Sequence, residues 1–90
     1  MDSIEILGMT AGTISSITFL PQVIKTWKSR SAKDISLWMI LFVTSSVILW
    51  LIYGIFLKSI PIIYTNSAVL LMSLILLYFK WKFGQSAPKD

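Results

Sequence analysis

Three long stretches without a charged residue dominate the chain, and short segments that carry the charged residues separate them. A helix needs about 20 mainly apolar residues to cross the roughly 30 Å hydrocarbon core of a bilayer, and each stretch reaches that length. The pattern predicts an all-α membrane protein, a single domain over 1–90 built as a bundle of three transmembrane helices. The uncharged stretches are 6–24, 35–57 and 59–79, and the expected helices cover about 4–27, 36–57 and 60–82.

The composition supports a membrane location and narrows the chemistry. Of the 90 residues, 56% are hydrophobic and 13% are charged, whereas a soluble domain carries about 25% charged residues. The chain contains no cysteine and no histidine, which excludes disulfides, zinc sites, haem ligation and thiol or imidazole catalysis. No set of side chains within the spans suits acid–base or nucleophilic catalysis. We therefore expect no enzyme activity, no metal and no cofactor.

The basic residues are divided unequally between the ends of the predicted spans. The second connection holds only Lys58, the N-terminal segment holds none, and the first connection and the C-terminal segment hold all the others. Lysine and arginine beside a span favour the cytoplasm. The bias therefore predicts an N-terminus outside the cell and a short cytoplasmic tail over 83–90. Because the basic residues sit at helix ends, the net charge of +4 indicates membrane orientation and no nucleic acid partner.

One tryptophan lies away from the membrane interface. Trp27, Trp38 and Trp81 would all lie at the inner interface, where tryptophan is enriched. By helix rise, Trp50 lies roughly 18 Å deeper than Trp38, and Asn66 lies about 22 Å from Trp81. A tryptophan at this depth often serves packing, and a membrane asparagine often joins helices. At one depth, however, an aromatic face and an amide also suit the C–H face and the hydroxyls of a sugar.

Pro21 and Gln22 interrupt the first predicted helix. Proline has no N–H to donate to the carbonyl four residues earlier, here that of Ile17, so the helix should kink. Thr18 and Gln22 are polar neighbours that could satisfy this carbonyl. The kink is either static, since proline is frequent in membrane helices, or a hinge for the half of the helix that follows it.

Small residues and the absence of charge add two expectations. Gly8, Gly12 and Ser16 recur at four-residue spacing, which lets another helix approach closely, within the chain or between chains. No acidic or basic side chain lies inside the uncharged stretches, although ion-coupled transporters usually carry one there. The spans therefore fit uncoupled passage of a neutral solute better than active pumping.

Several motifs in a fixed order resemble one membrane family. The first helix contains Phe-Leu-Pro-Gln at 19–22, the second contains Trp-Leu-Ile-Tyr-Gly at 50–54, and the third contains Pro61 followed by Asn66. With the chain's length and its three helices, this set resembles the bacterial SemiSWEET sugar transporters of the PQ-loop group over nearly the whole chain. The Pro-Gln pair alone is a weak signal, whereas the ordered set is specific.

The resemblance implies an assembly, a location and a substrate. Two three-helix bundles would form a parallel homodimer of six helices in the inner membrane of a bacterium. A mono- or disaccharide would bind on the twofold axis, between paired Trp50 and Asn66 side chains. Pro21, in the motif that it forms with Gln22, would serve as the hinge.

The same resemblance assigns two gates. Tyr53, one turn outward from Trp50, would belong to the outer gate, and we place Phe42, two turns inward, at the inner constriction. Some relatives close the outer side with an Arg–Asp pair, whereas this chain has Leu57 and Ser59 at those positions. We therefore expect Tyr53 and apolar neighbours, without an ion-pair latch, to close the outer side.

Two other functions stay open. A PQ-loop protein could carry another small solute such as an amino acid, but a charged solute would need a counter-charge that the spans lack. A small membrane interaction subunit would not need an aromatic ring and an amide at one depth beside a helix-breaking proline. The sequence thus favours uncoupled transport of small neutral sugars by alternating access, with the lipid bilayer and a second copy of the chain as partners.

Overall fold

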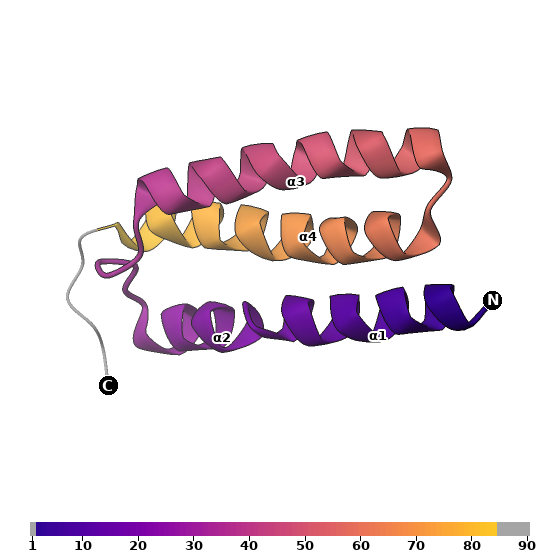
Figure 1. Cartoon of the computed structure of the whole chain (residues 1–90). Helices are drawn as coiled ribbons and strands as arrows, with labels where there is room; N and C mark the ends of the chain where they lie inside the picture. The colour runs from indigo at the N-terminus through magenta and orange to yellow at the C-terminus, as the bar shows by residue number, and fades with distance from the viewer. Residues whose placement is uncertain (1, 85–90) are drawn as a thin grey trace.

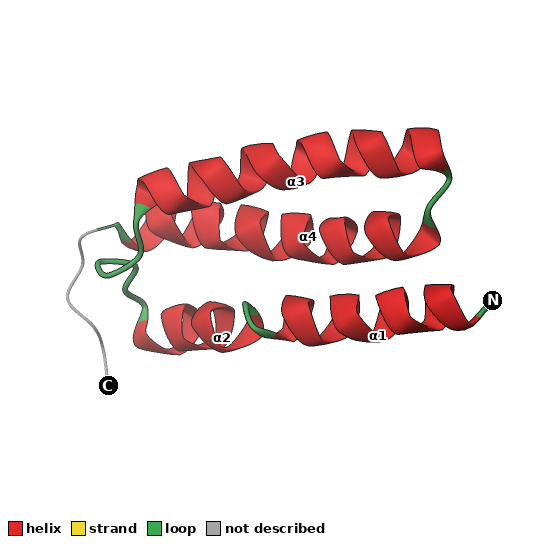
Figure 2. Cartoon of the chain, viewed as in Figure 1, coloured by secondary structure: helices red, strands yellow, loops and turns green. Residues whose placement is uncertain are grey.

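The computed structural model describes residues 2–84, which are built from α-helices (Figures 1 and 2). Three segments are long and apolar enough to cross a membrane, and α1 and α2 together form the first of them. This arrangement confirms the predicted all-α bundle of three membrane helices. Most of the predicted tail over 83–90 lies outside the described residues. The helices are α1 (Ser3–Ile17), α2 (Leu20–Ser29), α3 (Leu37–Leu57) and α4 (Ile60–Phe83).

The first predicted helix, over 4–27, is two helices in the structure. α1 ends at Ile17, and α2 carries Pro21 in its first turn. The amide of Thr18 bonds the carbonyl three residues earlier at 3.2 Å, so the α-helical pattern stops here. The Thr18 hydroxyl donates to the Ile14 carbonyl at 3.3 Å, and the expectation that it serves the Ile17 carbonyl is wrong. The break lies just before the residue whose missing N–H interrupts the helix.

Short connections make the neighbouring membrane helices antiparallel. Lys58 ends α3 with a left-handed backbone, φ 56°. The Ser59 hydroxyl then accepts a hydrogen bond from the Ile62 amide at 3.4 Å and begins α4. Ser36 begins α3 in the same way, with a bond from the Met39 amide at 3.2 Å. These caps satisfy amide groups that the first turn of a helix leaves without a partner.

α4 lies between the other two membrane spans (Figure 1). Within the described residues, α4 contacts α1, α2 and α3, whereas neither α1 nor α2 contacts α3. Ile40, Val47 and Gly54 are the buried residues of α3, and they recur at every second turn, so they share one face. Gly54 permits close packing there, because an added Cβ would lie 2.6 Å from Ile62 Cγ2. One face of α3 therefore packs on α4, and much of the remainder stays exposed.

Small residues let α1 approach α4 closely. A Cβ added to Gly8 would lie 2.9 Å from the Cβ of Pro61, and a Cβ added to Gly12 would overlap the Thr65 hydroxyl. Ser16 is buried, and its hydroxyl donates to the Gly12 carbonyl at 2.8 Å. The predicted close approach is therefore confirmed, and it occurs within the chain.

Basic residues gather at one end of the bundle. Figure 1 shows the end of α2, its connection to α3 and the end of α4 together, opposite the N-terminus and the α3–α4 turn. The tryptophans assigned to the interface belong to the same ends of α2, α3 and α4. We call this end the basic end. It carries Lys28, Arg30, Lys33, Lys80 and Lys82.

Candidate functional site

Residues from all three membrane spans line one hollow of about 480 Å³, which we call the central hollow. Three of the predicted site residues, Phe42, Trp50 and Asn66, meet there. None of the lining side chains is charged, so the hollow offers aromatic surface, one amide and one hydroxyl. The lining consists of Phe19, Phe42, Val43, Ser46, Val47, Trp50, Asn66 and Val69.

The Trp50 ring is held in place but stays accessible. Phe42, Ser46 and Trp50 follow one another at four-residue spacing, so they lie on one face of α3. The rings of Trp50 and Tyr53 meet edge to face, with centroids 5.5 Å apart and planes at 84°, a favourable aromatic geometry. Trp50 is nevertheless 50% exposed. The ring thus has a fixed orientation and free surface for stacking.

The Asn66 amide is oriented by its own helix. Its Nδ2 donates to the Ile62 carbonyl at 2.9 Å. An asparagine amide has a second N–H and an acceptor oxygen, and within the described residues neither bonds another helix. The half-buried side chain therefore does not join α4 to a neighbouring helix within the chain. Its remaining donor and acceptor are available to a ligand in the central hollow.

The other predicted site residues lie outside the central hollow. Tyr53 lines a neighbouring hollow of about 270 Å³ with Leu49 and Trp50. Pro21 stands in the first turn of α2. Gln22 lines a polar hollow nearer the basic end. The gate and hinge roles of these residues stay predictions.

The sequence analysis does not predict a role in the site for five residues that line the central hollow: Phe19, Val43, Ser46, Val47 and Val69. Ser46 lies one turn before Trp50, so the spacing on α3 could have revealed it. Phe19 lies in the break between α1 and α2. A residue at a helix break has no periodic pattern to indicate its direction, so only the fold places Phe19 in the site.

The chain matches known proteins along most of its length. The family described as PQ loop repeat matches residues 3–63. A "Sugar transporter SemiSWEET" of Bradyrhizobium diazoefficiens is 38% identical over 81 residues, which are 90% of this chain and 94% of that protein. A protein of the same name from Leptospira biflexa is 35% identical, with 89% of this chain and 94% of that protein covered.

A solved structure agrees with these sequence matches. The "Crystal structure of a bacterial homologue of SWEET transporters" superposes with a TM-score of 0.87 at 34% sequence identity, covering 92% of this chain and 100% of that chain. The similarity therefore includes the spatial order of the helices as well as the motifs. The chain belongs to the PQ-loop family and, within it, to the SemiSWEET group.

Proposed function

We propose that the chain carries small neutral sugars, mono- or disaccharides, by uncoupled alternating access along the axis of a parallel homodimer. The observation that carries this proposal is the central hollow, where Trp50 and Asn66 lie together without a charged neighbour in the lining. The ring suits the C–H face of a sugar, and the amide can donate to and accept from its hydroxyls. A charged solute would need a counter-charge to offset the loss of its hydration.

The names of the relatives support the substrate class. The proteins of Bradyrhizobium diazoefficiens and Leptospira biflexa are both named as sugar transporters. Sugar transport by a multi-pass membrane protein is accordingly the function of this chain, and the expectation that it is not an enzyme is confirmed. The uncoupled mechanism and the alternation between two conformations rest on the residues of this chain alone.

The exposure of the site supports a homodimer. Phe42 is 72% exposed and Tyr53 52% exposed, although both are large aromatic residues beside the site. In a lone bundle, the Asn66 amide would face hydrocarbon, where its free hydrogen-bonding groups lack partners. A second copy related by a twofold axis would cover this face and would add a second Trp50 and Asn66.

Orientation follows from charge. With the basic end in the cytoplasm, Tyr53 lies on the outer side of Trp50 and Phe42 on the inner side, as the gates require. A reporter fused to the C-terminus should then read cytoplasmic, and one fused to the N-terminus should read outside. Equal signals from both compartments for either terminus would rule out a single orientation and the parallel dimer with it.

Uptake of labelled sugars into liposomes that contain only this protein tests the site. Trp50→Ala and Asn66→Ala should each lower uptake about tenfold or more, since a lost contact of about 1.4 kcal/mol weakens binding tenfold. Trp38→Ala and Ser67→Ala are matched controls at exposed positions outside the central hollow, and they should transport like the parent.

Each result has a separate meaning. If Trp50→Ala or Asn66→Ala transports at the parent rate, that residue does not bind the substrate. If both variants fail to assemble, the two side chains serve packing. Labelled neutral amino acids in the same liposomes test the alternative substrate, and their uptake in place of sugars would overturn the proposal.

A further inference from the structure

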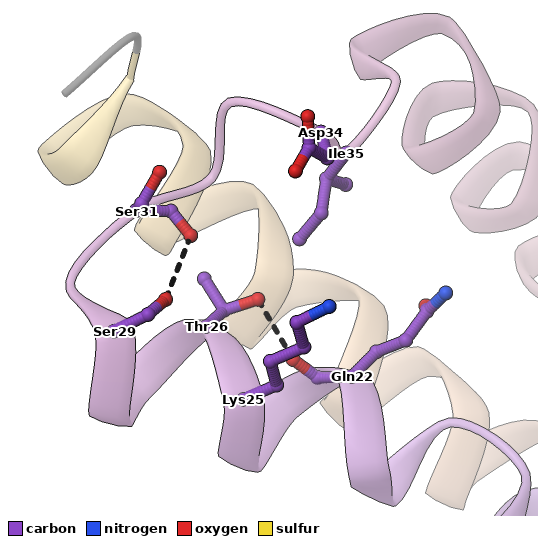
Figure 3. A pocket seen from close by; sticks show the side chains of 7 residues that line it. All are labelled: Gln22, Lys25, Thr26, Ser29, Ser31, Asp34 and Ile35. Atoms are coloured by element: carbon purple, nitrogen blue, oxygen red, sulfur yellow. Dashed lines mark hydrogen bonds between the residues drawn. The ribbon is translucent and has the colours of Figure 1, made fainter. Parts of the chain in front are cut away.

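A second, polar hollow of about 220 Å³ lies between α2 and the α2–α3 connection (Figure 3). Gln22, Thr26 and Ser29 line it from α2, at helical spacings of three and four residues. Phe19, which lines the central hollow, precedes Gln22 by the same spacing. The central hollow is therefore lined just before α2 begins, and the second hollow follows along α2 toward the basic end. We call the second one the basic-end hollow.

The charges of the basic-end hollow cancel. Lys25 lines it from α2 and Asp34 from the connection, and within the described residues no ion pair joins them. Figure 3 shows Asp34 across the hollow from the side chains of α2. An ammonium donates hydrogen bonds, a carboxylate accepts them, and an amide does both. A sugar hydroxyl also does both, and because one positive and one negative side chain line the hollow, its net charge favours neither a phosphate nor a cation.

The walls of this hollow are held by hydrogen bonds. The Thr26 hydroxyl donates to the Gln22 carbonyl at 2.7 Å, and the Ser29 hydroxyl donates to the Ser31 carbonyl at 3.4 Å. Each hydroxyl oxygen keeps acceptor capacity for a ligand.

The connection that carries Asp34 is tied to α4. The Ala32 carbonyl accepts from the Ile35 amide at 3.2 Å and from Lys80 Nζ at 2.8 Å. Asp34 therefore faces α2 from a segment that α4 holds in place, so one wall of the hollow is α2 and the other is a segment fixed on α4.

We propose that the basic-end hollow is a second binding site for a neutral polyhydroxylated ligand, and that a sugar occupies it between the central hollow and the basic end. The assignment rests on the proposed function for the identity of the ligand. No aromatic ring lines the basic-end hollow, so it binds a sugar more weakly than the central hollow, where Trp50 offers a stacking surface.

Thiol protection tests this site without transport. The chain contains no cysteine, so Ser29→Cys supplies one thiol in the basic-end hollow and Lys28→Cys supplies a matched thiol outside its lining. The purified protein in lipid nanodiscs is labelled with a maleimide in the presence of glucose, sucrose, inorganic phosphate or betaine. Sugar at roughly ten times its dissociation constant should slow Ser29→Cys labelling about tenfold, with no effect on Lys28→Cys.

A second series separates the two hollows. Protection of Ser29→Cys should persist when Trp50→Ala is added, because the basic-end hollow binds by itself. Asp34→Asn should raise the sugar concentration needed for protection by about tenfold, the effect of one lost charge-assisted hydrogen bond. Four results would overturn the second site. The first two are that sugar gives no protection and that protection disappears with Trp50→Ala. The other two are that protection survives Asp34→Asn unchanged and that phosphate protects better than sugar. Loss of the central site, in contrast, appears only in liposome uptake.

Discussion

α1 and α2 belong to the same membrane span, but they attach to α4 in different ways. α1 presents Gly8 and Gly12 to α4 with no space for a Cβ, and the Thr13 and Tyr64 hydroxyls lie 2.7 Å apart between the same two helices. We call this contact between α1 and α4 the α1 seam. α2 also contacts α4, but no hydrogen bond joins the described residues of these two helices. Much of the polar surface of α2 lines the basic-end hollow instead.

This contrast identifies the part of the span that is suited to move. A seam of glycines and a hydroxyl pair fixes α1, because any sliding would separate atoms already in close contact. The break at Thr18 interrupts the backbone bonds between α1 and α2. Under the proposed function, α2 swings on α1 and α4, and it moves one wall of the basic-end hollow with it.

The largest effect should come from filling the α1 seam. Gly12→Leu forces α1 away from Thr65, and overpacking of this kind costs about 1–3 kcal/mol or more. We expect loss of most folded protein, measured by size-exclusion chromatography and thermal unfolding. Ala11→Leu is the matched control, since Ala11 is exposed, and it should fold normally. A Gly12→Leu variant as stable as the parent would show that α1 is not fixed by its glycines.

The next effect concerns the hinge. Pro21→Ala restores an N–H at the break between α1 and α2, so the two helices can join into one stiffer span. Because Pro21 stands in the first turn of α2, where proline costs little, the gain in stability should be small. The variant should be at least as stable as the parent but should transport several-fold more slowly, with unchanged sugar affinity.

Liposome uptake and equilibrium sugar binding measure the two quantities for Pro21→Ala. Pro61→Ala is the matched control, because Pro61 also stands in the first turn of its helix, but α4 follows a turn at Lys58 and Ser59 and has no helix in line with it to join. A full transport rate in Pro21→Ala would exclude the hinge. Loss of binding in step with transport would instead mean that Pro21 shapes the site.

A smaller effect is expected where the α2–α3 connection is tied to α4. Lys80→Met removes the bond to the Ala32 carbonyl, at a cost of roughly 1 kcal/mol, because the ammonium is only partly buried. The connection should become more susceptible to protease in oriented vesicles. Lys82→Met is the control, since among the described residues Lys82 Nζ interacts with the Tyr78 and Phe83 rings, whose centroids lie 5.8 and 5.9 Å away, and with no carbonyl. If the two variants are equally susceptible to protease, the bond from Lys80 to the Ala32 carbonyl does not hold the connection on α4.

The smallest effect tests the hydroxyl pair of the α1 seam. Tyr64→Phe removes its bond to Thr13, and hydrogen bonds between membrane helices average about 0.6 kcal/mol. Thermal unfolding should show a slight decrease in stability with normal transport. Tyr78→Phe is the control, since no described residue bonds the Tyr78 hydroxyl. If Tyr64→Phe lowers the stability several times more than this, the hydroxyl pair contributes more to the α1–α4 contact than the glycines do.

Features that depend on one helix at a time were predictable from the sequence. The three membrane helices follow from the uncharged stretches, because the thickness of the bilayer sets the length of a span. The break follows from Pro21, because one missing N–H acts on its own helix. The shared depth of Trp50 and Asn66 follows from helix rise alone, and the structure places both in one hollow.

Only the tertiary structure decided how the helices face one another. That α4 lies between the other spans, that Gly12 meets Thr65, and that Phe19 lines the central hollow all depend on the rotation of each helix about its axis. In a chain that is apolar on nearly every face, hydrophobicity does not set this rotation, because lipid and protein are equally apolar surroundings. Close packing between residues far apart in the sequence sets it instead.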